Sequence, residues 1–354
     1  SAAEVNVGQA GQPAINGLDS FRIDGNKFIN LRSPGVTVRP DGNNATGLID
    51  HNTFLSSFTG TILVITINGG NAAFGRPLSL GTNNAIYVED NTITVSGDTS
   101  TSAEAYEGSR YVYRFNTFSN RASMSHHGAD SGGLRGIANF EVYNNTFTQS
   151  GAAIAYTMFF RSGVGVVFNN TTTGTYSNNF VVDNYRSCAA FAPWGGCDGT
   201  STWDENQGGQ SGYACLDQVG HFFTTGVGGS NEFARYYSWG NLRNGVAANT
   251  VKNTLANTCA TFQDVHMLEN REFYNGTASF DGTVGVGSGT IASRPATCTT
   301  GVGYWATDEG SWNTVNPGAD GQLYKCTATN TWTLYYTPLQ YPHPLMEANK
   351  YCCR

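Results

Sequence analysis

Three charged residues recur at matching positions in the middle of the chain. Glu107, Arg135 and Arg161 each stand nine to ten residues before an asparagine, in successive copies of a repeated segment. Arg110 lies close to the first of them, and His126 belongs to the sequence SHHGAD just upstream of the second. If the copies stack in register, carboxylate, guanidinium and imidazole groups would meet in one shallow groove. Such a groove could bind an acidic sugar and move a proton.

The same residues also have a purely structural interpretation. Glu107 and Arg135 could form an ion pair between neighbouring repeats, and His126 and His127 could be ordinary loop residues. The chain carries no clear catalytic motif, so the residues leave open whether it is an enzyme.

A second set of charged residues stands two positions before the same asparagines. This column begins with Asp24, Asp50 and Glu89 and continues with Arg114. Hard cations take several carboxylate oxygens, so the three acids could gather a calcium ion. The alternative is a solvated face on which Arg114 relieves the repulsion between the acids. No cofactor is required by the sequence, and calcium is the one ion that it suggests.

These side chains can meet only if the repeats stack on one another. Six copies of a short phrase occur in the first half of the chain: FRIDGNKF, GLIDHNTF, IYVEDNTI, YVYRFNTF, FEVYNNTF and GVVFNNTT. Their shared asparagine recurs every 25 to 39 residues, a period expected of one coil of a solenoid. Around it, apolar residues alternate with mixed ones, which predicts a strand with one face in the core.

The shared asparagine predicts a ladder of side-chain amides. Stacked copies would place these amides above one another, where they could exchange hydrogen bonds. We therefore expect a right-handed single-stranded parallel β-helix, because parallel crossovers are usually right-handed. An antiparallel sandwich also alternates and recurs, but usually with spacings of about 8 to 12 residues. The expected ladder comprises Asn26, Asn52, Asn91, Asn116, Asn145 and Asn170.

The chain changes character near residue 185. Residues 1–185 read as regular coils, whereas residues 186–354 read as a continuation of the β-helix with long loops and a pinned C-terminal tail. Fainter repeats such as YYSWGNLRNG occur in the second region, which holds every tryptophan and cysteine. The cysteines are Cys188, Cys197, Cys215, Cys259, Cys298, Cys326, Cys352 and Cys353.

The cysteines favour disulfides over a metal site. Their number is even and they contain no CxxC spacing. We predict one pairing, Cys188 with Cys197, and leave the others open. The adjacent Cys352 and Cys353 are expected to reach different partners, either in this chain or in a neighbouring subunit.

Composition limits the partners and the compartment. Only 13% of residues are charged and the formal net charge is −7, which argues against nucleic acid. No apolar run approaches the length of a membrane span. A chain that opens Ser-Ala-Ala and holds an even set of cysteines is expected to be the mature form of a secreted protein.

Several segments together resemble a known group of proteins. The phrases GLIDHNTF, SRYVYRFNTF, HHGADSGGLRGIANFEVYNNTF, GYACLDQVG and the closing YPHPL are similar to secreted right-handed parallel β-helix proteins of the pectate-lyase-like superfamily. The resemblance covers most of the chain and implies the fold. Pectate lyases of this superfamily use calcium held by aspartates beside a basic residue, a pattern that has no match here. No catalytic residue is carried over.

Two classes of function follow, with a third behind them. The first is an extracellular structural or adhesive protein that self-associates through its ends or faces into a filament or surface layer. The second is a carbohydrate-active enzyme, a polysaccharide lyase or glycoside hydrolase, using Glu107, Arg110, Arg135, Arg161 and His126. The third is a receptor-binding spike of the phage type.

Overall fold

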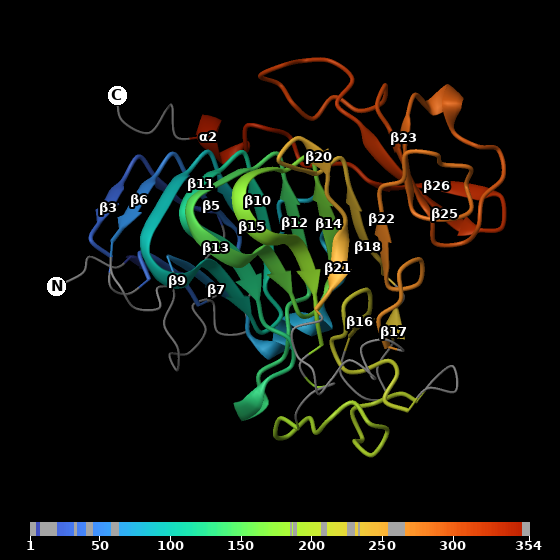
Figure 1. Ribbon diagram of the computed structural model, residues 1–354, viewed down its shortest axis with the longest axis horizontal. Helices are drawn as coiled ribbons and strands as arrows, with labels where there is room; N and C mark the ends of the chain where they lie inside the picture. Colours follow the sequence, from blue (N-terminus) through green and yellow to red (C-terminus); the bar gives the residue numbers. More distant parts are fainter. Residues whose placement is uncertain are drawn as a thin grey trace.

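Successive repeats of the chain add strands to two parallel sheets that curve around a common core (Figure 1). The computed structural model describes residues 5–7, 20–31, 34–39, 45–57, 64–184, 186, 190–206, 211–224, 231–232, 234–253 and 266–348. Side chains are described for these residues except 5–7, 97–101, 121 and 231–232.

Sheet 1 takes one strand from each repeat. Within the described residues it has eight strands, and every neighbouring pair is parallel. In order these are β2 (Phe21–Asp24), β5 (Gly47–Asp50), β8 (Ile86–Glu89), β10 (Arg110–Arg114), β12 (Asn139–Tyr143), β14 (Val164–Phe168), β18 (Tyr236–Trp239) and β22 (Phe273–Asn275). The last two continue the sheet beyond residue 185.

Sheet 2 contains the strand that follows each ladder asparagine, together with other short strands. Its long strands bend, and the bend gives the sheet the half-barrel curvature seen in Figure 1. For example, β9 pairs near its start with β6 and near its end with β7. Its members are β1 (Val5–Val7), β3 (Lys27–Ile29), β4 (Val36–Val38), β6 (Thr53–Ser56), β7 (Ile65–Asn68), β9 (Thr92–Tyr106), β11 (Thr117–His126), β13 (Thr146–Phe160), β15 (Thr171–Val182), β19 (Leu242–Arg243), β20 (Val246–Ala247) and β21 (Thr250–Lys252).

The ladder asparagines lie in a single file at the turn between the two sheets. Asn91 donates from Nδ2 to Asn116 Oδ1 at 3.0 Å, and Asn116 donates in the same way to Asn145 at 3.0 Å. The same contact links Asn170 to Asn241 at 2.9 Å, so the faint repeat YYSWGNLRNG adds a seventh member. The residue before each asparagine has a positive φ, as at Phe115 (57°), which turns the chain sharply from one sheet into the other.

The inner core is built from columns of apolar side chains at equal positions in the repeats. The register pairs Ile49 with Val88 and Phe118 with Phe147, and both columns are buried. The rings of Phe118 and Phe147 stack with centroids 4.5 Å apart and planes 8° apart. Alternation of apolar and mixed residues therefore corresponds to an inward and an outward face, as the sequence predicts.

The outward face of sheet 1 is also buried, which the sequence did not predict. Tyr87, Val112, Phe168 and Trp239 on this face form a second apolar cluster with residues from the C-terminal part of the chain. Because both faces are covered, whole strands such as β10 and β12 are buried at every residue. The solvated face considered for Arg114 is wrong, since this side chain is fully buried.

The C-terminal part of the chain provides that cover. A separate sheet of β23 (Val286–Gly289), β24 (Gly303–Ala306), β25 (Gln322–Ala328) and β26 (Thr331–Tyr336) lies beyond β22. From there the C-terminal strap, residues 337–348, runs back across sheet 1 and ends in α2 (Leu345–Ala348) near the N-terminal strands (Figure 1).

The other short elements lie in the loops. Within the described residues they are the antiparallel pair β16 (Phe222–Phe223) and β17 (Asn231–Glu232), and the 3-10 helices η1 (Asn71–Gly75), η2 (Ser131–Gly133) and η5 (Ile291–Ser293).

Two disulfides are present in the described residues, and they correct the predicted pairing. Cys197 bonds to Cys215 and Cys298 bonds to Cys326, so the prediction of Cys188 with Cys197 is wrong. The loop after Cys197 folds back on itself, with an antiparallel backbone β-bridge between Asp204 and Cys215. A prediction that pairs cysteines because they are close in sequence could not anticipate this. The remaining cysteines, Cys188, Cys259, Cys352 and Cys353, lie outside the described residues.

Candidate functional site

Most of the five residues predicted to form one groove, Glu107, Arg110, Arg135, Arg161 and His126, have partners outside this set, although Arg161 Nε donates to the His126 carbonyl oxygen at 2.9 Å. Arg110 donates to backbone carbonyls of segment 73–77 at 2.9 to 3.0 Å, and burial lowers its pKa to about 10. Arg135 forms a buried ion pair with Asp217, with Nε 3.0 Å from Oδ2, and lies over the ring of Phe74.

His126 and Glu107 contact the predicted arginines through backbone groups. His126 points into the core, where Nδ1 lies 2.8 Å from the Tyr111 hydroxyl and Nε2 lies 2.9 Å from the Ser162 carbonyl oxygen. Burial holds the pKa of His126 well below its usual range, so the ring is neutral. Glu107 occupies a half-buried turn with φ of 47°, and its backbone N–H donates to the Arg135 carbonyl. The His126 side chain is therefore part of the core.

A different set of polar side chains does converge, on the outer face of sheet 2. We call it the His127 cluster, and its members are Glu104, Tyr106, His127, Asp130 and Arg161. Only Arg161 belongs to the set predicted from the sequence.

Strand periodicity places these residues outward. Glu104 and Tyr106 stand two apart on β9, so they share a face, while the alternate residues Ala103 and Ala105 enter the core. His127 directly follows β11, and its N–H donates to the Ala105 carbonyl at 2.9 Å. Arg161 directly follows β13, whose register with β11 pairs His126 with Phe160 and so brings Arg161 beside His127. Asp130 caps η2 through its contact with Ser131.

His127 is held between two carboxylates. Its Nε2 lies 3.1 Å from Glu104 Oε1, and its Nδ1 lies 3.0 Å from Asp130 Oδ2. The Ser125 hydroxyl donates to Glu104 at 3.0 Å, and the Arg161 guanidinium lies 3.9 Å from the same oxygen. This arrangement fixes the imidazole ring from both of its nitrogens.

The proton count of this arrangement suits proton transfer. A neutral imidazole carries one N–H and can donate to only one of the two carboxylates. Both contacts are therefore hydrogen bonds only if the ring is an imidazolium or if one carboxyl group holds a proton. The His127 cluster therefore places one imidazole between two possible hydrogen-bond acceptors.

Neighbouring groups shift the pKa of Asp130 and of Tyr106 in opposite directions. Burial acts to raise the pKa of Asp130, but hydrogen bonds from the Ser131 N–H and from His127 outweigh it and lower the pKa overall. The Tyr106 ring stacks on His127 with centroids 4.2 Å apart. Burial, and then the charge of Glu104, raises the pKa of Tyr106, so its hydroxyl stays protonated at neutral pH.

The cluster is partly open to solvent. The side chains of His127 and Asp130 are each 22% exposed, whereas those of Glu104 and Arg161 are 6% exposed. His127 and Asp130 are therefore partly accessible to solvent, while Glu104 and Arg161 are buried beside them.

Matching residues by their offset from the ladder asparagines could not reveal this cluster. Tyr106, His127 and Arg161 follow their ladder asparagines by 15, 11 and 16 residues. The offsets differ because irregularities in β9, β11 and β13 insert residues between the ladder and the end of each strand. The sequence nevertheless contained a useful signal. Two strand-like segments, SAEAY and SMSHH, have polar residues at alternate positions up to their ends.

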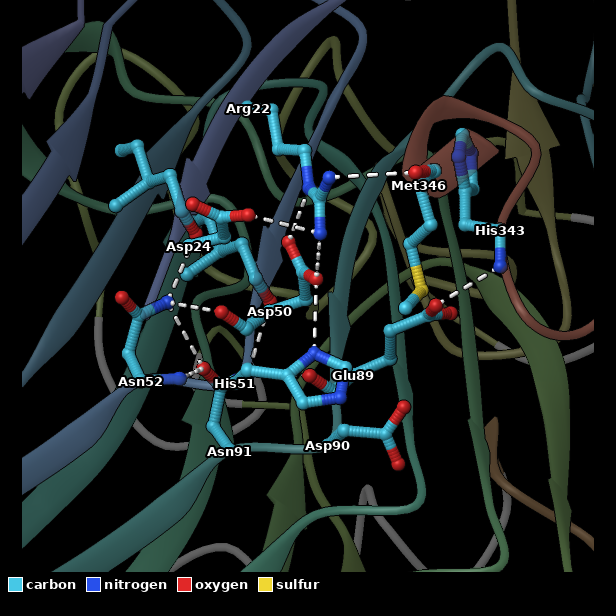
Figure 2. Close-up of polar contacts among 12 residues, drawn as sticks. Arg22, Asp24, Asp50, His51, Asn52, Glu89, Asp90, Asn91, His343 and Met346 are labelled. Carbon is cyan, nitrogen blue, oxygen red and sulfur yellow. Dashed lines mark hydrogen bonds and ion pairs between the residues drawn. The ribbon is translucent and has the colours of Figure 1, made fainter. Parts of the chain in front are cut away.

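The acidic column has arginine partners instead of a calcium ion. Arg22 contacts Asp24 at 2.9 Å and Asp50 at 2.7 Å, and Arg114 contacts Glu89 at 2.6 Å. Figure 2 shows these acids beneath the C-terminal strap, where the His343 N–H donates to Glu89 at 2.9 Å. In the described part of the chain, no three acidic groups of this column lie close enough together to share one ion. The column therefore does not fit a calcium site.

Comparison with protein families, curated proteins and solved structures finds no match to this chain. Among the described residues, no helix has the length and apolar character needed to cross a bilayer.

Proposed function

We propose that the chain is a secreted, right-handed, single-stranded parallel β-helix of the pectate-lyase-like kind. Parallel pairing throughout sheet 1 and the file of ladder asparagines support this fold. The preference of parallel crossovers for one hand supports the handedness. Two disulfides support an oxidising, extracellular compartment.

We further propose that the protein is a carbohydrate-active enzyme that cleaves an acidic extracellular polysaccharide at the His127 cluster. The observation that carries this proposal is His127 held between Glu104 and Asp130 on an accessible sheet face. General acid–base catalysis needs a positioned group that gains and loses a proton near neutral pH, and an imidazole fits that need.

The arrangement is best suited to cleavage by β-elimination next to a uronic acid. The buried Arg161 adds positive charge beneath the cluster, which would favour a sugar carboxylate nearby and make the neighbouring C–H more acidic. Both nitrogens of His127 contact carboxylates, so His127 can accept that proton once one of these contacts opens. Tyr106 is neutral and can donate a proton to the leaving glycosidic oxygen. Elimination breaks the C–O bond and leaves a double bond in the sugar ring.

The test is a panel of acidic polysaccharides with neutral polysaccharides as matched controls. We expect oligosaccharides with unsaturated ends from an acidic polymer, detected by ultraviolet absorbance and mass spectrometry, and none from neutral polymers. Saturated ends would indicate hydrolysis instead of elimination. A broad panel that yields no product would overturn the proposal.

A structural or adhesive protein is the second candidate. The observation that favours it is a group of exposed apolar side chains at the last strands of sheet 2: Leu242 is 39%, Val246 69% and Val251 42% exposed. Apolar groups left in water at the end of a stack favour self-association.

The same end is protected against simple end-to-end stacking through sheet 2. Arg243 donates to the Ser177 carbonyl at 2.7 Å, and the Asn244 side chain bonds the N–H and carbonyl of Gly174 at 2.7 and 3.2 Å. These contacts occupy backbone groups on the open edge of β15 that a second molecule would need. A filament would therefore have to form through other surfaces, such as the exposed apolar group.

Sedimentation and electron microscopy of the native protein test the second candidate. Long particles that shorten in a Val246→Lys variant would support it, because a buried lysine opposes the contact. Particles that are monomeric at every concentration would contradict it, and closed trimers would favour a receptor-binding spike.

A further inference from the structure

Two cysteines and a histidine meet in a buried position outside the His127 cluster. Cys197, Cys215 and His266 are each at most 1% exposed. Their ligand atoms all lie within 4.8 Å of one another, and His266 Nδ1 lies 3.7 Å from Cys215 Sγ. Cys197 and Cys215 are 18 residues apart and joined by a disulfide, whereas His266 follows Cys215 by 51 residues and is brought to the pair by the fold.

The orientation of His266 is fixed by hydrogen bonds. Its Nε2 lies 2.6 Å from the Ser211 carbonyl oxygen, and a carbonyl can only accept, so Nε2 carries the proton. The lone pair is therefore on Nδ1, which faces the sulfur atoms. Arg271 and Gln218 both donate to the His266 carbonyl oxygen, which fixes the backbone as well. A histidine that donates one N–H to a carbonyl and presents the other nitrogen is the usual arrangement of a metal ligand.

We propose that Cys197, Cys215 and His266 bind a zinc-class divalent cation when the two cysteines are reduced. Zinc prefers thiolate sulfur and imidazole nitrogen in a tetrahedron. With the usual Zn–S and Zn–N bond lengths, the N···S edge of that tetrahedron is about 3.6 Å. The Nδ1 to Sγ distance of 3.7 Å already matches it.

The charges and the proton balance are consistent with this site. Two thiolates neutralise one divalent cation, so the buried site carries no net charge. A phosphine reductant supplies two electrons: the S–S bond breaks, water provides the oxygen and two protons, and phosphine oxide and two thiols form. Binding of the cation then releases the two thiol protons. A disulfide and a bound cation would thus be two alternative ways to hold the same loop. The metal site is independent of the proposed enzymatic function.

The second disulfide provides a matched control. Cys298 and Cys326 are also buried and bonded, but they do not belong to any group of three ligands in the described residues. Reduction of this pair should create no tight metal site.

The experiment compares full-length variants after anaerobic phosphine reduction and incubation with Zn²⁺, followed by desalting and metal analysis. We expect one zinc per chain in the wild type and in a Cys298→Ser/Cys326→Ser variant, and none in a Cys197→Ser/Cys215→Ser variant. The untreated, oxidised protein should retain none. Equal zinc in both double variants, or no zinc in any sample, would overturn the proposal.

A second variant keeps the test informative if the serine variant folds poorly. His266→Gln leaves both thiols in place and should weaken zinc binding at least about tenfold. Cobalt(II) should give a tetrahedral thiolate spectrum in the reduced wild type and an altered one in this variant. An unchanged cobalt spectrum in a variant with wild-type near-ultraviolet circular dichroism would contradict the role of His266.

Discussion

Asn116 shows how a single ladder residue joins three repeats. Its Nδ2 donates to the carbonyl of Val88 at 2.8 Å and to Asn145 Oδ1 at 3.0 Å, and its Oδ1 accepts from the backbone N–H of Asn91 at 3.0 Å. The residue is buried, so none of these groups can turn to water instead.

We expect Asn116→Ala to lower the free energy of unfolding by about 3 kcal/mol, because it leaves buried donors and acceptors without partners. Urea denaturation measures this change. Asn26→Ala is the matched control, since Asn26 is exposed at the N-terminal end of the ladder and should cost less than about 1 kcal/mol. Equal losses in the two variants would mean that the ladder does not stabilise the stack in this way.

Glu141 introduces a pH dependence. It accepts hydrogen bonds from the Tyr336 hydroxyl and the Gly81 N–H, yet burial outweighs them and raises its pKa to about 7 from 4.5. A group that holds its proton more tightly when folded stabilises the fold fully below pH 4.5. That contribution is lost as pH rises to 7, on the order of 3 kcal/mol.

Glu141→Gln should remove this pH dependence, because the amide stays neutral at every pH. The measurement is the difference in unfolding free energy between variant and wild type from pH 4.5 to 7. The difference is needed because His343 acts in the opposite sense: burial lowers its pKa to about 4, which favours the folded state as pH rises. Parallel curves for the two proteins would contradict the assignment.

At the scale of elements, the C-terminal strap is the part of the fold that stabilises sheet 1 from outside. Arg114 donates to the carbonyls of Leu339 and Gln340 at 2.7 and 2.9 Å. Tyr341 stacks on Phe115 with centroids 3.8 Å apart and donates to Asp90 at 2.9 Å.

Ending the chain after Tyr336 should therefore expose the buried pair of Arg114 and Glu89 and destabilise the protein by at least about 3 kcal/mol. Hydrogen exchange should quicken in β8 and β10, which lie under the strap, but not in β13, which belongs to sheet 2. Unchanged exchange in β8 and β10 would show that the strap does not hold this face.

The repeats predicted which strands are neighbours, but not what covers them. Alignment on the asparagine gives the register of sheet 1 because the turn to the next strand has constant length. It cannot give the register at the C-terminal ends of β9, β11 and β13, near His127. There, inserted residues change the number of positions after the ladder asparagine. The strap was not predicted because its contacts join residues more than 200 positions apart, as with Arg114 and Leu339. Aromatic residues such as Tyr87 in an outward column were the available sign that this face is covered.

At the scale of the whole molecule, the outside of sheet 2 presents a row of exposed side chains at matching positions, such as Thr117, Thr146 and Thr171. A long polymer such as a polysaccharide can follow such a row, because each repeat offers the next position along it. The His127 cluster spans the ends of β9, β11 and β13 and so lies across three neighbouring repeats.

The measurement that tests the proposed activity most directly is the rate of polysaccharide cleavage by the wild type, His127→Asn and His51→Asn. His51 is a half-exposed histidine that also contacts a carboxylate, Asp50, but lies at the turn beside sheet 1. We expect cleavage by the wild type and by His51→Asn, and a loss of at least about 100-fold in His127→Asn without loss of thermal stability. Equal cleavage by His127→Asn and the wild type would contradict the assignment of the site.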